Sequence, residues 1–143
     1  MHVASILKVK GQAVETVRID ATLMTAARRL SSKRIGAVVV TDKSGDIAGI
    51  VSERDIVHTL AKEGVAALDW PVSEVMTRDV LTCTAGDTID QLMSRMTARR
   101  CRHLPVVSDG ALAGIISIGD VVKHHIAEVE MEAMAMRDYI ATG

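Results

Sequence analysis

The chain has 143 residues, a formal net charge of −1 and a hydrophobic fraction of 48%, but only one Trp, one Tyr and no Phe. Roughly two-thirds of its surface can be buried on folding, and it is too short for a (β/α)8 catalytic barrel of about 250 residues. The balanced charge and the scarcity of aromatic side chains make nucleic-acid binding an unexpected function. No apolar run approaches the ~18 residues of a membrane span, so we expect no membrane partner.

The N-terminal segment and the cysteines indicate in which cellular compartment the protein is expected. Residues 1–11 hold lysines but neither the apolar region nor the cleavage-site pattern of a signal peptide, so we expect a cytoplasmic protein. Cys83 and Cys101 form no CxxC pair, which is typical of reduced thiols. Arg100 and Arg102 flank Cys101 and are expected to lower the pKa of its thiol.

In the first half of the chain, an extended stretch at Glu15–Ile19 precedes a helix that begins after Thr22, where apolar residues recur at helical spacing. Two strands follow, at Ala37–Val40 and Ile47–Val51, and the turn residues between them predict a hairpin. Ser52 stands where the second strand ends, so it is the expected N-cap of a second helix.

The second half repeats the same order of elements. They are an extended stretch at Val80–Cys83, a helix after Thr88, strands at Leu104–Val107 and Leu112–Ile116, and a helix capped by Ser117. Each half is therefore β-α-β-β-α, a unit that leaves one face of its sheet uncovered. We expect an α+β fold in which the two units pack with pseudo-twofold symmetry. The linker between them holds Trp70, and a short helix is predicted at Val72–Met76.

The similarity of the halves extends to the residues themselves, which indicates a duplication. Residues 45–57 read GDIAGIVSERDIV and residues 110–122 read GALAGIISIGDVV, with seven of the thirteen positions identical. Upstream, Val38–Asp42 aligns with Pro105–Asp109. The expected boundaries are 9–65 for the first repeat, 72–128 for the second repeat and 129–143 for a C-terminal helical tail.

Apolar residues continue past the second repeat at spacings of three and four, which predicts a C-terminal helix longer than the fold needs. They are Ile118, Val121, Val122, His125, Ile126, Val129, Met136 and Ile140. This stripe packs either across the base of its own module or against a second copy or partner helix, and the sequence leaves both open.

The motifs GIVSERD and GIISIGD, with RHLPVV at Arg102–Val107, resemble the cystathionine β-synthase (CBS) domain. Two such domains in tandem form a Bateman module, and the resemblance covers roughly Val9–Glu128. The chain also resembles bacterial stand-alone CBS-pair proteins, which often carry an IMP dehydrogenase label by similarity to that enzyme's regulatory insert. The catalytic barrel of IMP dehydrogenase has no counterpart in these 143 residues, so we do not expect that activity.

The repeated motif has the chemistry of a nucleotide site. In each repeat a helix begins at the serine, and its free N–H groups favour an anion. The carboxylates of Asp55 and Asp120, one turn later, suit the hydroxyls of a ribose, and Arg54 can reach a phosphate. Helix capping is the alternative role of both aspartates. The resemblance implies ribose binding by Asp55 with Ser52 nearby and by Asp120 with Ser117 nearby.

Other candidates come from the strands. The resemblance places base contacts at Ile35, Gly36 and Ala37 in the first repeat and at Arg102, His103 and Pro105 in the second. His103 could contact a phosphate or be a surface histidine at a strand start. Thr16 and Thr82 could touch the base or ribose, or could reflect β-propensity alone. Val51 and Ile116 could support an adenine ring, because the expected pockets contain no aromatic side chain.

The two pockets are expected to differ in affinity or ligand, unless one dinucleotide bridges both. Arg54 has Gly119 as its counterpart, whereas the second repeat has an arginine cluster, Arg99, Arg100 and Arg102, before its first hairpin strand. We expect a regulatory module that binds an adenine nucleotide (AMP, ADP, ATP or NAD(H)), senses energy or redox state and signals to an unknown effector protein. No catalytic residue, metal or required cofactor is expected, and the module should form a homodimer. The alternatives are a small nucleotide-processing enzyme and a ligand-independent homodimeric scaffold.

Overall fold

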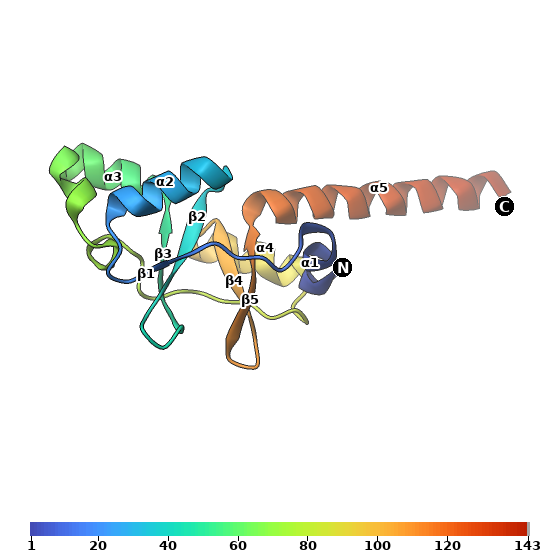
Figure 1. The fold of residues 1–143 in the computed structure, drawn as a ribbon. Helices are drawn as coiled ribbons and strands as arrows, with labels where there is room; N and C mark the ends of the chain where they lie inside the picture. Colours follow the sequence, from blue (N-terminus) through green and yellow to red (C-terminus); the bar gives the residue numbers. More distant parts are fainter. Residues whose placement is uncertain (143) are drawn as a thin grey trace.

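The computed structural model describes residues 1–142, so Gly143, the last residue of the expected tail, lies outside it. The chain folds into the expected α+β arrangement with a C-terminal helix (Figure 1). Its elements are α1 Val3–Lys10, β1 Thr16–Arg18, α2 Leu23–Lys33, β2 Ala37–Thr41, β3 Ile47–Ser52, α3 Glu53–Glu63, the 3-10 helices η1 Val65–Asp69 and η2 Val72–Glu74, α4 Ile89–Arg99, β4 His103–Ser108, β5 Ala111–Ser117 and α5 Ile118–Thr142.

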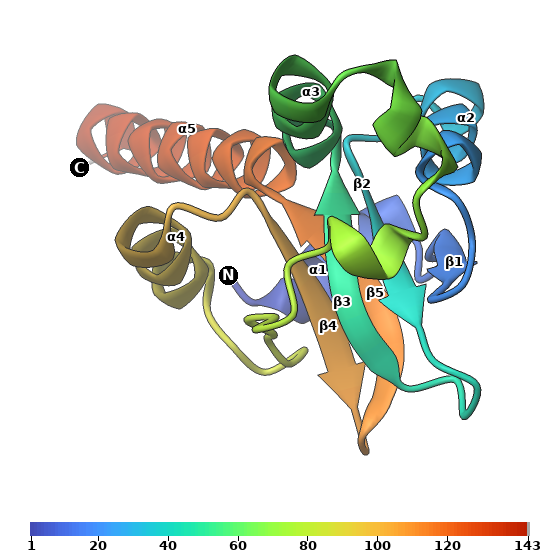
Figure 2. The same ribbon diagram turned by 90° about the vertical axis from the view of Figure 1, so that its left-hand side faces the viewer.

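Each repeat has its own sheet. In the first, β1 pairs parallel with β2 and β2 pairs antiparallel with β3; in the second, β4 and β5 form the predicted hairpin. Helices α2 and α3 pack beside each other against the first sheet, while α4 and α5 belong to the second repeat (Figure 2). The stretch Val80–Cys83 is shorter as a strand than expected, because only Cys83 forms a bridge, parallel to Val106.

The strand ladders correct the alignment of the repeats by one residue. Ala37 pairs with Ser52 and His103 pairs with Ser117, so Ala37 is the structural counterpart of His103. The sequence alignment had set Val38 against Pro105, one position further on. The cause is the first hairpin, whose turn holds one residue more than the second.

Each repeat completes its core with the segment that leads into the other repeat. The side chains of Val3, Ile6 and Leu7 on α1 are buried with the core of the second repeat. Val72 and Met76, at the start of the second repeat, are buried with the core of the first. The sequence analysis did not anticipate this exchange, because it assigned no helix to the first ten residues.

The glycine in each repeated motif is required by the exchanged segments. A Cβ atom on Gly114 would lie 2.7 Å from Cδ2 of Leu7, and one on Gly49 would lie 2.6 Å from Sδ of Met76 and 2.8 Å from the Thr77 carbonyl oxygen. Glycine within a strand is typical of such a close approach. The motif glycines therefore allow α1 and the η2 segment to pack onto β5 and β3.

Helix α5 leaves the body of the molecule after about residue 128, where the Glu128 carboxylate pairs with the N-terminal ammonium group at 3.3 Å. Val121 is fully buried, but the later apolar side chains of the stripe are exposed, among them Val122, Ile126 and Val129. Figure 1 shows the helix extending well past the other elements. Packing across the module's own base is therefore limited to the start of α5. No helix within residues 1–142 is both long enough and apolar enough to cross a membrane.

Candidate functional site

A cavity of about 500 Å³ lies between the two repeats. The first repeat contributes Gly36 and the N-terminal turn of α3, from Ser52 to Asp55, with His58 one turn further on. The opposite wall comes from Arg99–His103, where α4 ends and β4 begins, and from the connecting segment Thr77–Leu81. The cavity therefore joins residues that are far apart in the chain.

Asp55 caps helix α3 and also has a carboxylate oxygen without a hydrogen-bond partner among the described residues. Its backbone N–H donates to Ser52 Oγ at 3.2 Å, and its Oδ2 accepts the Ser52 N–H at 2.9 Å, which forms a capping box at the start of α3. Its other carboxylate oxygen, Oδ1, accepts no hydrogen bond within residues 1–142. Capping thus uses one oxygen and leaves the second available to a ligand.

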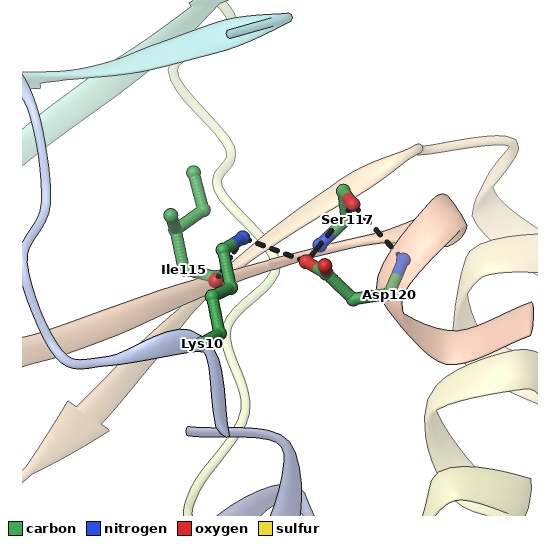
Figure 3. Close-up of polar contacts among 4 residues, drawn as sticks. All are labelled: Lys10, Ile115, Ser117 and Asp120. Carbon is green, nitrogen blue, oxygen red and sulfur yellow. Dashed lines mark hydrogen bonds and ion pairs between the residues drawn. The ribbon is translucent and has the colours of Figure 1, made fainter. Parts of the chain in front are cut away.

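Asp120 repeats the cap but has an additional partner (Figure 3). Its Oδ2 accepts the backbone N–H and the hydroxyl of Ser117, both at 2.9 Å, and the ammonium group of Lys10 at 2.6 Å. Lys10 also donates to the Ile115 carbonyl at 2.9 Å. Burial raises the pKa of Asp120, but the hydrogen bonds from Lys10 and Ser117 outweigh it and hold this pKa below its ordinary value.

The cavity brings together six of the residues singled out in the sequence: Gly36, Ser52, Arg54, Asp55, Arg102 and His103. Arg102 and His103, assigned from the sequence to the pocket of the second repeat, share this cavity with Asp55 of the first. The cavity therefore combines candidate residues from both repeats. Ile35 lines a neighbouring depression of about 540 Å³ on the first repeat.

The other predicted residues lie outside the lining of this cavity: Thr16, Ala37, Val51, Thr82, Pro105, Ile116, Ser117 and Asp120. Val51 and Ile116 are fully buried in the two hydrophobic cores. Conversely, the sequence analysis did not assign His58 or the segment Thr77–Leu81 to a site. No local pattern marks them, because only the packing of the repeats brings them to the cavity.

Arginine side chains are concentrated at this one cavity. They are Arg54, Arg99, Arg100 and Arg102, of which Arg99 forms an ion pair with Asp79 at 3.0 Å. Arg100 ends α4 in the left-handed conformation, with φ of 52°, and Arg34 does the same at the end of α2, with φ of 53°. Elsewhere the two repeats differ, because the counterparts of Arg54 and Arg102 are Gly119 and Gly36.

Burial determines the protonation of the neighbouring groups. It lowers the pKa of His103, as does nearby Lys10, and the carboxylates of Glu53 and Asp120 only partly oppose this. Burial raises the pKa of the Cys101 thiol, with Arg99 opposing it only in part, so the expectation of a lowered pKa was wrong. The pKa of Cys83 is raised to about 11, chiefly by burial. Neither thiol is an activated nucleophile at neutral pH.

The family model for the CBS domain matches the chain twice, over residues 9–62 and 72–126. Among curated proteins, the chain is 30% identical over 150 residues to the CBS domain-containing protein CBSX3, mitochondrial, of Arabidopsis thaliana, covering 99% of this chain and 72% of that protein. It spans only 22% of CBSCBSPB2 of the same plant, at 31% identity over 82% of this chain.

Solved structures with similar folds include ligand complexes. The CBS-domain containing protein ATU1752 from Agrobacterium tumefaciens has a TM-score of 0.83 and 50% identity, covering 85% of this chain and 91% of its own. PAE2072 from Pyrobaculum aerophilum, complexed with AMP, has a TM-score of 0.75 and 26% identity over 84% of this chain and 89% of its own. The CBS domain pair of MJ0100, complexed with 5′-methylthioadenosine and S-adenosyl-L-methionine, has a TM-score of 0.79 and 25% identity over 90% of this chain and 98% of its own.

Proposed function

Because the chain belongs to the CBS-domain family, we propose that it is a regulatory module that binds an adenine nucleotide in the cavity between its repeats. One observation carries this proposal: Asp55, whose Oδ1 accepts no hydrogen bond from the described residues, and the arginines of the second repeat line the same cavity of about 500 Å³. This volume lies within the range of small-molecule sites, roughly 300–1,000 Å³. Asp55 accepts hydrogen bonds from the ribose hydroxyls, and the guanidinium groups bind the phosphate.

The charge of the cavity selects a phosphorylated ligand. Four arginines face three carboxylates, those of Glu53, Asp55 and Asp79, and one of the arginines is already paired with Asp79. Guanidinium groups match phosphate oxygens in a bidentate geometry and bind them more strongly than neutral groups do. We therefore rank AMP, ADP, ATP and NAD(H) above uncharged adenosine and above S-adenosylmethionine, whose sulfonium group is cationic.

Ligand binding provides a route to signalling without chemistry. The ligand touches Asp55 in one repeat and Arg99–His103 in the other, so it favours the arrangement of repeats that allows both contacts. Helix α5 follows Ser117 directly, so a movement of the second repeat also moves this helix. A second copy of the chain covers the exposed apolar stripe of α5, so the nucleotide signal, of energy or redox state, reaches an effector protein through a homodimer.

A thermal-shift panel tests the proposed function. The ligands are adenosine, AMP, ADP, ATP, NAD, NADH and S-adenosylmethionine, and any that binds the folded chain raises its melting temperature. The phosphorylated ligands should stabilise the protein more than adenosine does. Arg100→Gln should reduce this advantage, and Arg34→Gln, at the same left-handed helix end of the first repeat, should retain it.

Two results would contradict the proposal. The first is an unchanged melting temperature with every adenine compound, which would favour a ligand-independent scaffold. The second is an enzymatic conversion of ATP or NADH to a product, detected by chromatography. This conversion would have to disappear in Asp55→Asn. That result would identify an enzyme.

A further inference from the structure

We propose that Lys10 occupies the second Ser-x-x-Asp motif in place of a ligand, so that each chain binds a single nucleotide, at Asp55. The inference rests on the proposed function and specifies which of the two repeated motifs performs it. Lys10 is thus a specificity-determining residue, although it lies outside both copies of the motif.

The ammonium group of Lys10 forms two short hydrogen bonds at the second motif. Its ammonium group lies 2.6 Å from Asp120 Oδ2 and 2.9 Å from the Ile115 carbonyl oxygen (Figure 3). Both side chains are largely covered, with 34% of Lys10 and 25% of Asp120 exposed. Lys10 thereby neutralises the carboxylate that ribose hydroxyls would otherwise approach, and it bonds Oδ2, whereas Oδ1 accepts no hydrogen bond within residues 1–142. A nucleotide at this motif would have to share the carboxylate with the ammonium group, whose charge-assisted hydrogen bond weakens that carboxylate as an acceptor.

The backbone of α1 holds Lys10 in this position. The Val3 N–H donates to the Asp87 carbonyl at 2.9 Å, and the Ile89 N–H donates to the Met1 carbonyl at 3.0 Å. Val3 and Ile6 are fully buried in the core of the second repeat. Lys10 is the last residue of a helix anchored on both its backbone and its apolar face, so its ammonium group is delivered to Asp120 by the fold.

The first motif lacks an equivalent cation. Met76 lies over Gly49 as Leu7 lies over Gly114, so the segment after Met76 corresponds to the end of α1. That segment brings Asp79 to the cavity, where it pairs with Arg99. In the described part of the chain, no lysine or arginine forms an ion pair with Asp55. The carboxylate of the motif is thus without a paired cation in the first repeat and paired with Lys10 in the second.

The second motif is also poor in phosphate-binding groups. Gly119 stands at the position of Arg54, and Gly36 stands at the position of Arg102. A ligand at Asp120 would therefore lack two of the guanidinium groups of the first site, those of Arg54 and Arg102. We therefore expect weaker binding there even after Lys10 is removed.

Calorimetric titration with AMP tests the stoichiometry directly. The wild-type chain should bind one AMP per chain. Lys10→Met retains the apolar stem of the side chain and removes the cation, so this variant should bind a second AMP with lower affinity. Lys8→Met, on an exposed position of the same helix, is the matched control and should bind one. Adding Asp120→Asn to Lys10→Met should remove the second binding event.

The outcomes separate this inference from the proposed function. Two AMP molecules per wild-type chain, or a Lys10→Met variant that still binds one, would overturn the role of Lys10 and leave the nucleotide site in place. Absence of AMP binding to the wild-type chain, with other adenine nucleotides equally inert, would contradict the proposed function itself. Circular dichroism of each variant establishes that α1 and the rest of the fold are retained.

Discussion

Replacing Asp120 by Asn should destabilise the protein more than the same replacement of Asp55. Both residues cap a helix through a serine, and an asparagine oxygen can retain the bond to the serine N–H. Asp120 also accepts the Ser117 hydroxyl at 2.9 Å. Only Asp120 has Lys10 as a partner, at 2.6 Å. The difference between the two variants therefore measures the additional contacts of the Asp120 carboxylate, those with Lys10 and with the Ser117 hydroxyl.

The expected magnitude follows from the partial burial of this ion pair. Exposed ion pairs contribute about 0–1 kcal/mol, and hydrogen bonds to charged groups contribute about 1.5–3 kcal/mol. With a quarter of the Asp120 side chain and a third of Lys10 exposed, we expect Asp120→Asn to lower the free energy of unfolding by about 1–2 kcal/mol. This corresponds to a fall in Tm of roughly 2–8 °C for a chain of this size. Asp55→Asn should lose less than about 1 kcal/mol, the value of a carboxylate at a helix N-terminus.

The loss should also depend on pH. The pKa of Asp120 is lowered in the folded protein by Lys10 and Ser117, in excess of the opposing effect of burial. Its stabilising contribution is therefore present above the unfolded pKa of about 3.9 and disappears as the pH falls through the folded pKa. Urea unfolding at pH 7 and at steps down to pH 3.5 should show the gap between wild type and Asp120→Asn closing in the acid range. Equal losses for the two variants, or a gap that is independent of pH, would refute this reasoning.

Three further perturbations address other parts of the structure. Gly49→Ala should lower the free energy of unfolding by about 1–3 kcal/mol, because its Cβ would lie 2.6 Å from Met76 Sδ, whereas Gly86→Ala, with no atom within 4 Å of the added Cβ, should cost far less. NAD affinity should rise as the pH is lowered from 8 to 6, because a nearby phosphate raises the depressed pKa of His103 and binding takes up a proton; a slope that persists in His103→Gln would contradict this. Ile126→Asp should shift the mass measured by light scattering from that of a dimer to that of a monomer. Ala127→Asp, which lies off the apolar stripe of α5, should leave the mass unchanged. A monomeric wild-type protein would contradict the proposed homodimer.

Local features of the fold could be predicted from the sequence because they depend on neighbouring residues. Thr22, Ser52 and Thr88 cap the helices that their positions predict, and both hairpins form where the turn residues indicate. The alignment of the strands of one repeat with those of the other was predicted less accurately, because the first turn holds one extra residue. Helix α1 was not expected, because its short apolar stripe is buried only against the second repeat.

The candidate site was only half predictable for a related reason. The pairing of Ser52 with Asp55 is a short-range pattern and could be recognised in the sequence. That Arg102 and His103 share a cavity with Asp55 of the other repeat depends on how the repeats pack. The contact between Lys10 and Asp120 joins residues 110 positions apart and carries no sequence signature. The two copies of the motif thus have different surroundings, and their sequence similarity alone does not predict this difference.

AMP titration of Asp55→Asn and Asp120→Asn is the most direct test of a single nucleotide site between the repeats. Loss of a charged acceptor for the ribose hydroxyls costs about 1.5–3 kcal/mol, so Asp55→Asn should raise the Kd for AMP by roughly 10- to 100-fold. Asp120→Asn should leave this Kd unchanged, because its carboxylate is bonded to Lys10. An unchanged Kd in Asp55→Asn, or an equal rise in both variants, would contradict the account.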